Sequence, residues 1–89
     1  MADYIGQVPE EVDALAADFE TKAGDLEALK SAISAKLDGT VWTGQDRDRF
    51  QADWEGTFSQ NITTVVQQLR QAGQQATDNA QQQRDASGS

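Results

Sequence analysis

The side chains that most often carry out catalysis or bind metal ions are scarce in this 89-residue chain. It contains no histidine and no cysteine, which removes the usual general base, the commonest metal ligands and any disulfide. Its densest charge cluster is Asp46-Arg47-Asp48-Arg49. A catalytic carboxylate there would need burial to shift its pKa, whereas negative charge in the first turn of a helix is favoured by the helix dipole. The sequence therefore predicts a protein that is not an enzyme and has no catalytic residues, cofactor or metal.

Charge and hydropathy argue against two further classes of function. The net charge is −8 and the pI is near 4.1, whereas nucleic acids and anionic membranes bind surfaces rich in Lys and Arg. No apolar run is long enough to cross a bilayer. Residues 1–6 lack the basic and apolar regions of a signal peptide. We therefore expect no nucleic-acid partner, no membrane insertion and, by these ordinary rules, a cytoplasmic protein.

The stretch Val41-Trp42-Thr43-Gly44 separates two segments that have the pattern of amphipathic helices. Gly39 is well placed to end the first segment in a left-handed conformation, which residues with a Cβ avoid. Thr43 and Asp46 have the spacing of a capping box, so Thr43 is expected to cap the second segment. Trp42 then lies on a short connection, where its ring could fold over a helix or fit a groove of a partner.

Large apolar residues recur at steps of three, four or seven in both segments, as expected for one face of a helix. Pro9 suits the first turn of the first helix, and Lys22 is the main departure from the apolar pattern. The first stripe is Val12, Leu15, Phe19, Leu26, Leu29 and Ile33, and the second stripe is Phe50, Trp54, Phe58, Ile62, Val65 and Leu69.

These patterns predict an all-α fold, a hairpin of two long antiparallel amphipathic helices that forms one domain over residues 1–89. The first helix should cover about 8–38, the turn 39–44 and the second helix about 44–86. A chain of this length is near the size at which one core barely offsets the loss of chain entropy. In a single hairpin the apolar side chains of the two stripes cannot all be buried. We therefore predict that the stripe residues form an interface with a partner chain.

The second half of the second helix has a different composition. Its stripe continues only through Ala72, Ala76 and Ala80, and eight glutamines lie between Gln67 and Gln83. Alanines permit close approach of another helix but supply little apolar area. The glutamines are interpreted as a solvated helix surface, with hydrogen bonding to another chain as the alternative.

A short acidic chain of two amphipathic helices joined by Trp42-Thr43-Gly44 resembles the WXG family, the small helical-hairpin proteins of type VII secretion that include early secreted antigens. In this family the Trp-x-Gly turn lies between the helices. Phe50 and Trp54 stand where the family has large apolar residues, and Val8-Pro9-Glu10-Glu11-Val12 is similar to its usual first-helix opening. The likeness covers nearly the whole chain.

The resemblance implies that the hairpin pairs with a second hairpin into an elongated four-helix bundle, either as a homodimer or with a sister protein. It also implies that the protein is exported folded, without a cleaved signal peptide, from the cytoplasm to the medium or cell surface by type VII machinery. This implication overturns the cytoplasmic expectation. Trp42 and Gly44 would then belong to the turn that the machinery recognises.

One departure from the family pattern concerns the motif Tyr-x-x-x-Asp/Glu, which members or their partners commonly carry after the second helix. The only tyrosine here is Tyr4, and the nearest trace of the motif runs from Gln81 to Asp85. A partner could supply the signal, this chain could do without it, or the chain could belong to a divergent branch. The departure also keeps a second class open, an intracellular helical adaptor or chaperone that covers an apolar segment of a larger client.

Overall fold

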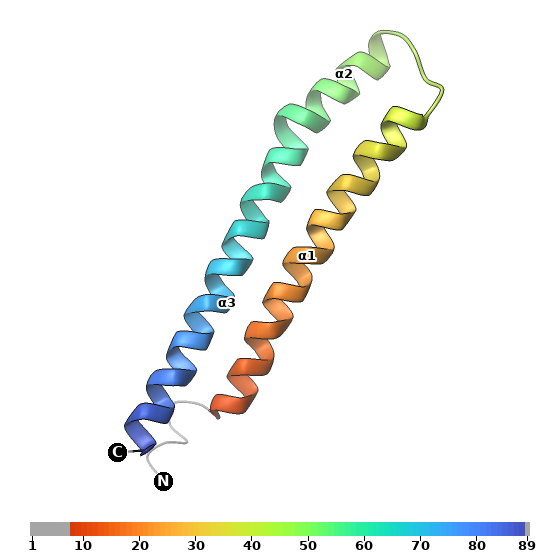
Figure 1. Ribbon diagram of the computed structural model, residues 1–89. Coiled ribbons are helices and arrows are strands. Elements are labelled where there is room, and N and C mark those ends of the chain that lie inside the picture. Colours follow the sequence, from red (N-terminus) through yellow and green to blue (C-terminus); the bar gives the residue numbers. More distant parts are fainter. Residues whose placement is uncertain (1–7, 89) are drawn as a thin grey trace.

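The computed structural model describes residues 8–88, and these form a hairpin of two long antiparallel helical arms (Figure 1). The first arm is α1, Pro9–Gly39, and the second arm consists of α2, Gln45–Asp53, the π-helical turn η2, Trp54–Phe58, and α3, Ser59–Gly88. The hairpin is a rod of 65 × 18 × 15 Å. The predicted all-α hairpin is confirmed. Tyr4 lies outside the described residues.

The N-terminal end of α1 agrees with the prediction, and its C-terminal end differs from it. Pro9 occupies the first turn, as its fixed φ favours. Gly39, however, is not left-handed, since Gly44 is the only glycine with positive φ among the described residues. The chain instead leaves α1 at Thr40 in an extended conformation, with φ −89° and ψ 131°. The Thr40 hydroxyl donates to the Lys36 carbonyl oxygen, so a terminal carbonyl is satisfied without a left-handed residue.

The prediction that Thr43 caps the second helix in a capping box is also wrong. The N-cap of α2 is Gly44, and no side chain caps this end of the helix. Thr43 lies one residue outside the N-cap, so its hydroxyl is not at the position from which a cap reaches the second or third helical N–H. Gly44 has φ 115°, a conformation that L side chains rarely adopt. This backbone geometry explains why a glycine stands two residues after Trp42.

The second arm is not a continuous α-helix. At η2 the Ser59 N–H donates to the Trp54 carbonyl oxygen, a bond that spans five residues instead of four. Such a turn contains one extra residue and changes the rotation of everything on one side of it relative to the other. The extra residue therefore determines which side chains of α2 face α1.

None of the helices within residues 8–88 has a stretch long and apolar enough to cross a bilayer.

Candidate functional site

Small residues form the seam between the two arms. Apart from Trp54, the buried positions are spaced by seven or fourteen residues, namely Ala16, Ala23 and Leu37 on the first arm and Val66, Gly73 and Ala80 on the second. A Cβ added at Gly73 would lie 3.2 Å from the Ala16 carbonyl oxygen and 3.3 Å from Phe19 Cβ. The two helix backbones therefore approach closely, and little large side-chain surface is buried between them.

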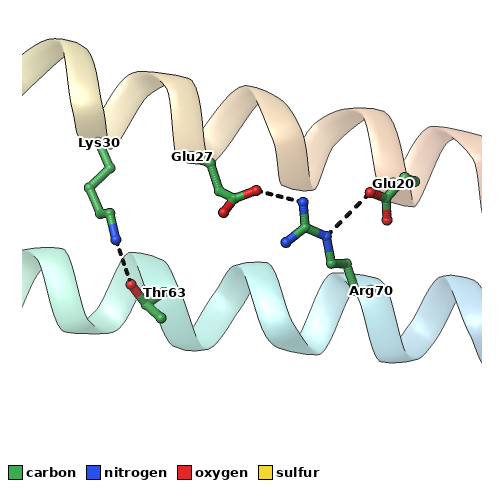
Figure 2. Close-up of polar contacts among 5 residues, drawn as sticks. All are labelled: Glu20, Glu27, Lys30, Thr63 and Arg70. Carbon is green, nitrogen blue, oxygen red and sulfur yellow. Dashed lines mark hydrogen bonds and ion pairs between the residues drawn. The ribbon is translucent and has the colours of Figure 1, made fainter.

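Ion pairs and hydrogen bonds cross the seam on one side, which we call the polar edge. Arg70 bonds both Glu20 and Glu27, with its Nε 3.3 Å from Glu20 Oε1 (Figure 2). Lys30 Nζ donates to Thr63 Oγ1 at 2.9 Å. Nearer the open end of the hairpin, Arg84 pairs with Asp13. These contacts give the charged side chains of the polar edge their hydrogen-bond and ion-pair partners within the same chain.

The hydrogen bond to Glu27 raises the pKa of Arg70, and the hydrogen bond to Asp13 raises the pKa of Arg84. A raised pKa means that the charged form is favoured by folding, so this stabilisation is present below the ordinary arginine pKa and is lost only above it. Both arginines stay charged through the neutral range. Deprotonation of these arginines therefore does not make the two contacts switches near neutral pH.

The opposite side of the seam, which we call the apolar edge, collects ten of the twelve stripe residues. The positions next to the seam are half-buried, and the outer positions are exposed, with exposed fractions of 50% at Leu15 and 45% at Phe58. Because polar-edge residues of both helices turn toward one side, the stripe residues turn toward the other. The apolar edge is Val12, Leu15, Phe19, Leu26, Leu29, Ile33, Phe58, Ile62, Val65 and Leu69.

The remaining two stripe residues lie elsewhere. Trp54 is only 8% exposed and lies within the hairpin, where its Nε1 donates to Ser34 Oγ at 2.8 Å. Phe50 is 39% exposed and contacts the ring of Trp42, with the ring centroids 5.7 Å apart. The structure therefore places Trp54 in the hairpin contact and Phe50 beside the turn.

The turn between the arms presents an aromatic surface at one end of the rod. Trp42 is 39% exposed and Val41 is fully exposed. Arg47 from α2 reaches back and donates from Nη2 to the Leu37 carbonyl oxygen at 3.3 Å, which ties the start of the second arm to the end of the first. Gly44 supplies the positive φ described above. The Arg47 hydrogen bond thus links the two helices that flank the turn, while the Trp42 ring remains accessible.

The described residues, 8–88, contain no cluster of metal-ligating side chains. No group of three carboxylates there could hold a metal ion. A cavity of about 130 Å³ lies on the polar edge, and its charged lining residues are Glu27, Lys30 and Arg70. All three already contact a neighbour across the seam. The charged groups that line this cavity therefore bind one another or a hydroxyl of the other arm.

The sequence patterns missed the seam and the polar edge. The stripes were identified by large apolar side chains, whereas the seam consists mainly of alanine and glycine. The available signal was the spacing of seven shared by Ala16 and Ala23 and again by Val66, Gly73 and Ala80. Ser34 and Arg47 carried no signal in the sequence, because their partners come from the other arm.

Comparison with protein families gave one match. The model of a family described as "Proteins of 100 residues with WXG", WXG100, matches residues 6–86. The match includes both arms and the turn with its exposed tryptophan. Comparison with curated proteins and with solved structures gave no match.

Proposed function

Because the chain belongs to the WXG100 family, whose members are small helical proteins of the type VII secretion kind, we propose that it is a non-enzymatic protein exported folded by this route. In this proposal the protein leaves the cytoplasm as a pair of hairpins without a cleaved signal peptide and reaches the medium or the cell surface. The apolar edge forms the pairing surface, and Trp42 with Gly44 shapes the end of the rod that the export machinery recognises.

The exposed apolar edge is the observation that carries the proposal. Leu15, Leu29, Ile33, Phe58 and Val65 are each 40% to 50% exposed and lie on one side of the rod. A continuous apolar strip of this kind on a small protein marks an interaction surface. The charged side chains of the polar edge already have partners within the chain. The apolar edge is therefore the side at which we expect a partner to bind. Pairing of two such edges gives a four-helix bundle.

The proposed role of the turn is tested by substitutions at its exposed aromatic residue. Trp42→Ala should lower the amount of protein in the medium of the native host several-fold, because the accessible ring is lost. The solution mass should stay unchanged, since Trp42 lies at the end of the rod and outside the apolar edge. Val41→Ala is the matched control, because Val41 is the fully exposed neighbour, and it should leave export unchanged.

Two results would contradict parts of the proposal. Equal export of wild type and Trp42→Ala would remove the role given to the turn. Finding the protein only in cell lysate would favour an intracellular adaptor or chaperone that uses the same apolar edge.

A further inference from the structure

We infer that the cavity on the polar edge binds the C-terminal carboxylate of a peptide chain whose last side chain is small and apolar. The inference goes beyond the proposed function, because the polar edge lies opposite the apolar edge and stays accessible when the apolar edge is covered. It is carried by the position of Lys30, its lack of a carboxylate partner, the unused donors around the cavity, and the apolar part of the cavity lining.

Lys30 occupies a position of the seam that is otherwise filled by small or apolar residues. It follows Ala23 by seven residues, as Ala23 follows Ala16, and it precedes Leu37 by seven. Those three residues are buried, whereas Lys30 is half-buried. A lysine at such a position of a helix pair specifies register at a cost in stability. The seam therefore holds a positive charge among apolar neighbours.

Of the cations on the polar edge within residues 8–88, Lys30 alone has no carboxylate partner, since Arg70 and Arg84 each pair with a carboxylate across the seam. Lys30 Nζ bonds only Thr63 Oγ1, which in turn donates to the Ser59 carbonyl oxygen at 3.1 Å. An ammonium group has three N–H donors, so two of them have no acceptor on this part of the chain. A half-buried cation with unused donors favours an anionic ligand.

Glu27 and Lys30 are three residues apart on α1, a spacing at which opposite charges can pair along a helix. No ion pair joins them, because Glu27 turns to Arg70 and Lys30 turns to Thr63 (Figure 2). The cavity of about 130 Å³ is lined by all four residues. The Arg70 nitrogen that neither carboxylate uses, Nη1, points to the side of Lys30 (Figure 2). Positively charged donors therefore reach the cavity from both arms, with the Glu27 carboxylate beside them.

This combination of groups matches the end of a peptide chain. A terminal carboxylate can bind Lys30 Nζ and Arg70 Nη1 together, while the amide N–H next to it can donate to Glu27. A free phosphate has no such amide donor, and its higher negative charge is repelled by Glu27.

The apolar part of the lining sets the size of the last side chain. Ile62 and Val66 supply it, and Val66 is only 3% exposed. A cavity of roughly 150 Å³ admits a molecule the size of benzene. The cavity of about 130 Å³ therefore suits a small aliphatic side chain such as that of valine. It is partly open to solvent, so the rest of a bound chain can leave it.

The test is a titration of the isotope-labelled protein with N-acetylvaline, which carries the carboxylate, the adjacent N–H and the aliphatic side chain. The NMR shifts of the Thr63 and Gln67 amides report on the cavity, because both residues line it. These shifts should saturate with a Kd on the order of 1 mM, as expected for a ligand of this size. N-acetylvaline methylamide keeps the side chain and lacks the charge. It should bind roughly tenfold more weakly, because the hydrogen bonds to charged groups are weakened.

Lys30→Met removes the cation and keeps an unbranched side chain of similar length. It should weaken the binding of N-acetylvaline roughly tenfold, and it should fold, because a flexible apolar side chain suits the seam. Lys22→Met is the matched control. It makes the same change of charge on the same helix, but Lys22 is exposed and contacts Asp25 of its own helix at 3.9 Å. This variant should bind as the wild type does.

The outcomes separate the parts of the inference. Saturable binding that is weakened in Lys30→Met and kept in Lys22→Met supports it. Unchanged binding in Lys30→Met, or equal binding of the acid and its methylamide, overturns the assignment of a carboxylate. The absence of any saturable shift overturns the site itself.

The acetylated tripeptide Ala-Ala-Val distinguishes a chain end from a small free acid as the source of the carboxylate. Binding at least as tight as that of N-acetylvaline supports a chain end, and weaker binding overturns it. None of these results depends on pairing or export. The export of Trp42→Ala therefore decides the proposed function separately.

Discussion

Gly24 and Gly73 are both glycines inside long helices, but their surroundings predict opposite effects of substitution. A Cβ at Gly24 meets nothing within 4 Å. Gly24→Ala should therefore raise the free energy of unfolding by about 1 kcal/mol, the difference in helix propensity. At Gly73 the added carbon would meet the Ala16 carbonyl oxygen at 3.2 Å. Gly73→Ala should lower stability, because this backbone atom cannot move without shifting α1 away from α3.

Denaturant unfolding of both variants, followed by circular dichroism at one protein concentration, measures the two effects. Gly24 lies away from the apolar edge, so pairing should not complicate the comparison. An equal rise in both variants would mean that α1 and α3 do not approach as closely as the seam indicates.

At the scale of the element, η2 determines which side chains of the second arm face the first. Phe50, Trp54, Phe58 and Ile62 follow at three successive steps of four. In an ideal α-helix each step of four overshoots one turn by about 40°, so this stripe would drift about 120° around the helix. The extra residue of the π-helical turn compensates for part of this rotation of the stripe around the helix. Trp54 is thereby kept in the hairpin contact, although the residues after it belong to the apolar edge.

Deletion of Gly56 should restore an α-helical turn and rotate α2 by about 100° relative to α3. Trp54 would then lose its contact with Ser34 and become exposed. We expect a red shift of the Trp54 fluorescence, recorded in a Trp42→Phe background, and a lower melting temperature. Gly56→Ala is the control, because a Cβ there meets nothing within 4 Å and the residue count of the turn is kept. Identical emission from the two variants would show that the π turn does not position Trp54.

The same elements show how much the sequence alone could predict. Periodicity identified two helical arms because large apolar residues mark a helix face strongly. It could not show that the arms contact each other through Ala23 and Gly73, since small residues give a weak hydropathy signal. It also could not show the polar edge, because Arg70 and Glu27 are distant in the sequence. The π turn left a trace in the run of steps of four and in Gly56, a weak helix former that could indicate a slight bend, but neither signal identifies a π turn.

At the scale of the whole molecule, the rod has too little buried surface to be a self-sufficient core. Among the described residues half of the buried apolar side chains are alanines, and the larger ones are Leu37, Trp54 and Val66. Most of the other large apolar residues lie on the apolar edge, where the hairpin leaves them half-buried or exposed. Stability and association are therefore expected to be linked, as they are in dimers whose protomers lack a complete core.

This linkage predicts that the melting temperature of the purified chain rises with protein concentration. Val65→Asp should abolish the rise over about a hundredfold range of concentration, because the dimer would have to bury an unpaired carboxylate. Thr64→Asp is the matched control: it adds the same charge one residue earlier, on the solvent-facing side of α3, where Thr64 is exposed and its hydroxyl bonds only the Gln60 carbonyl oxygen. Calorimetry at several concentrations measures both variants. A wild-type melting temperature independent of concentration, or equal behaviour of the two aspartate variants, would show that the apolar edge is not what completes the core.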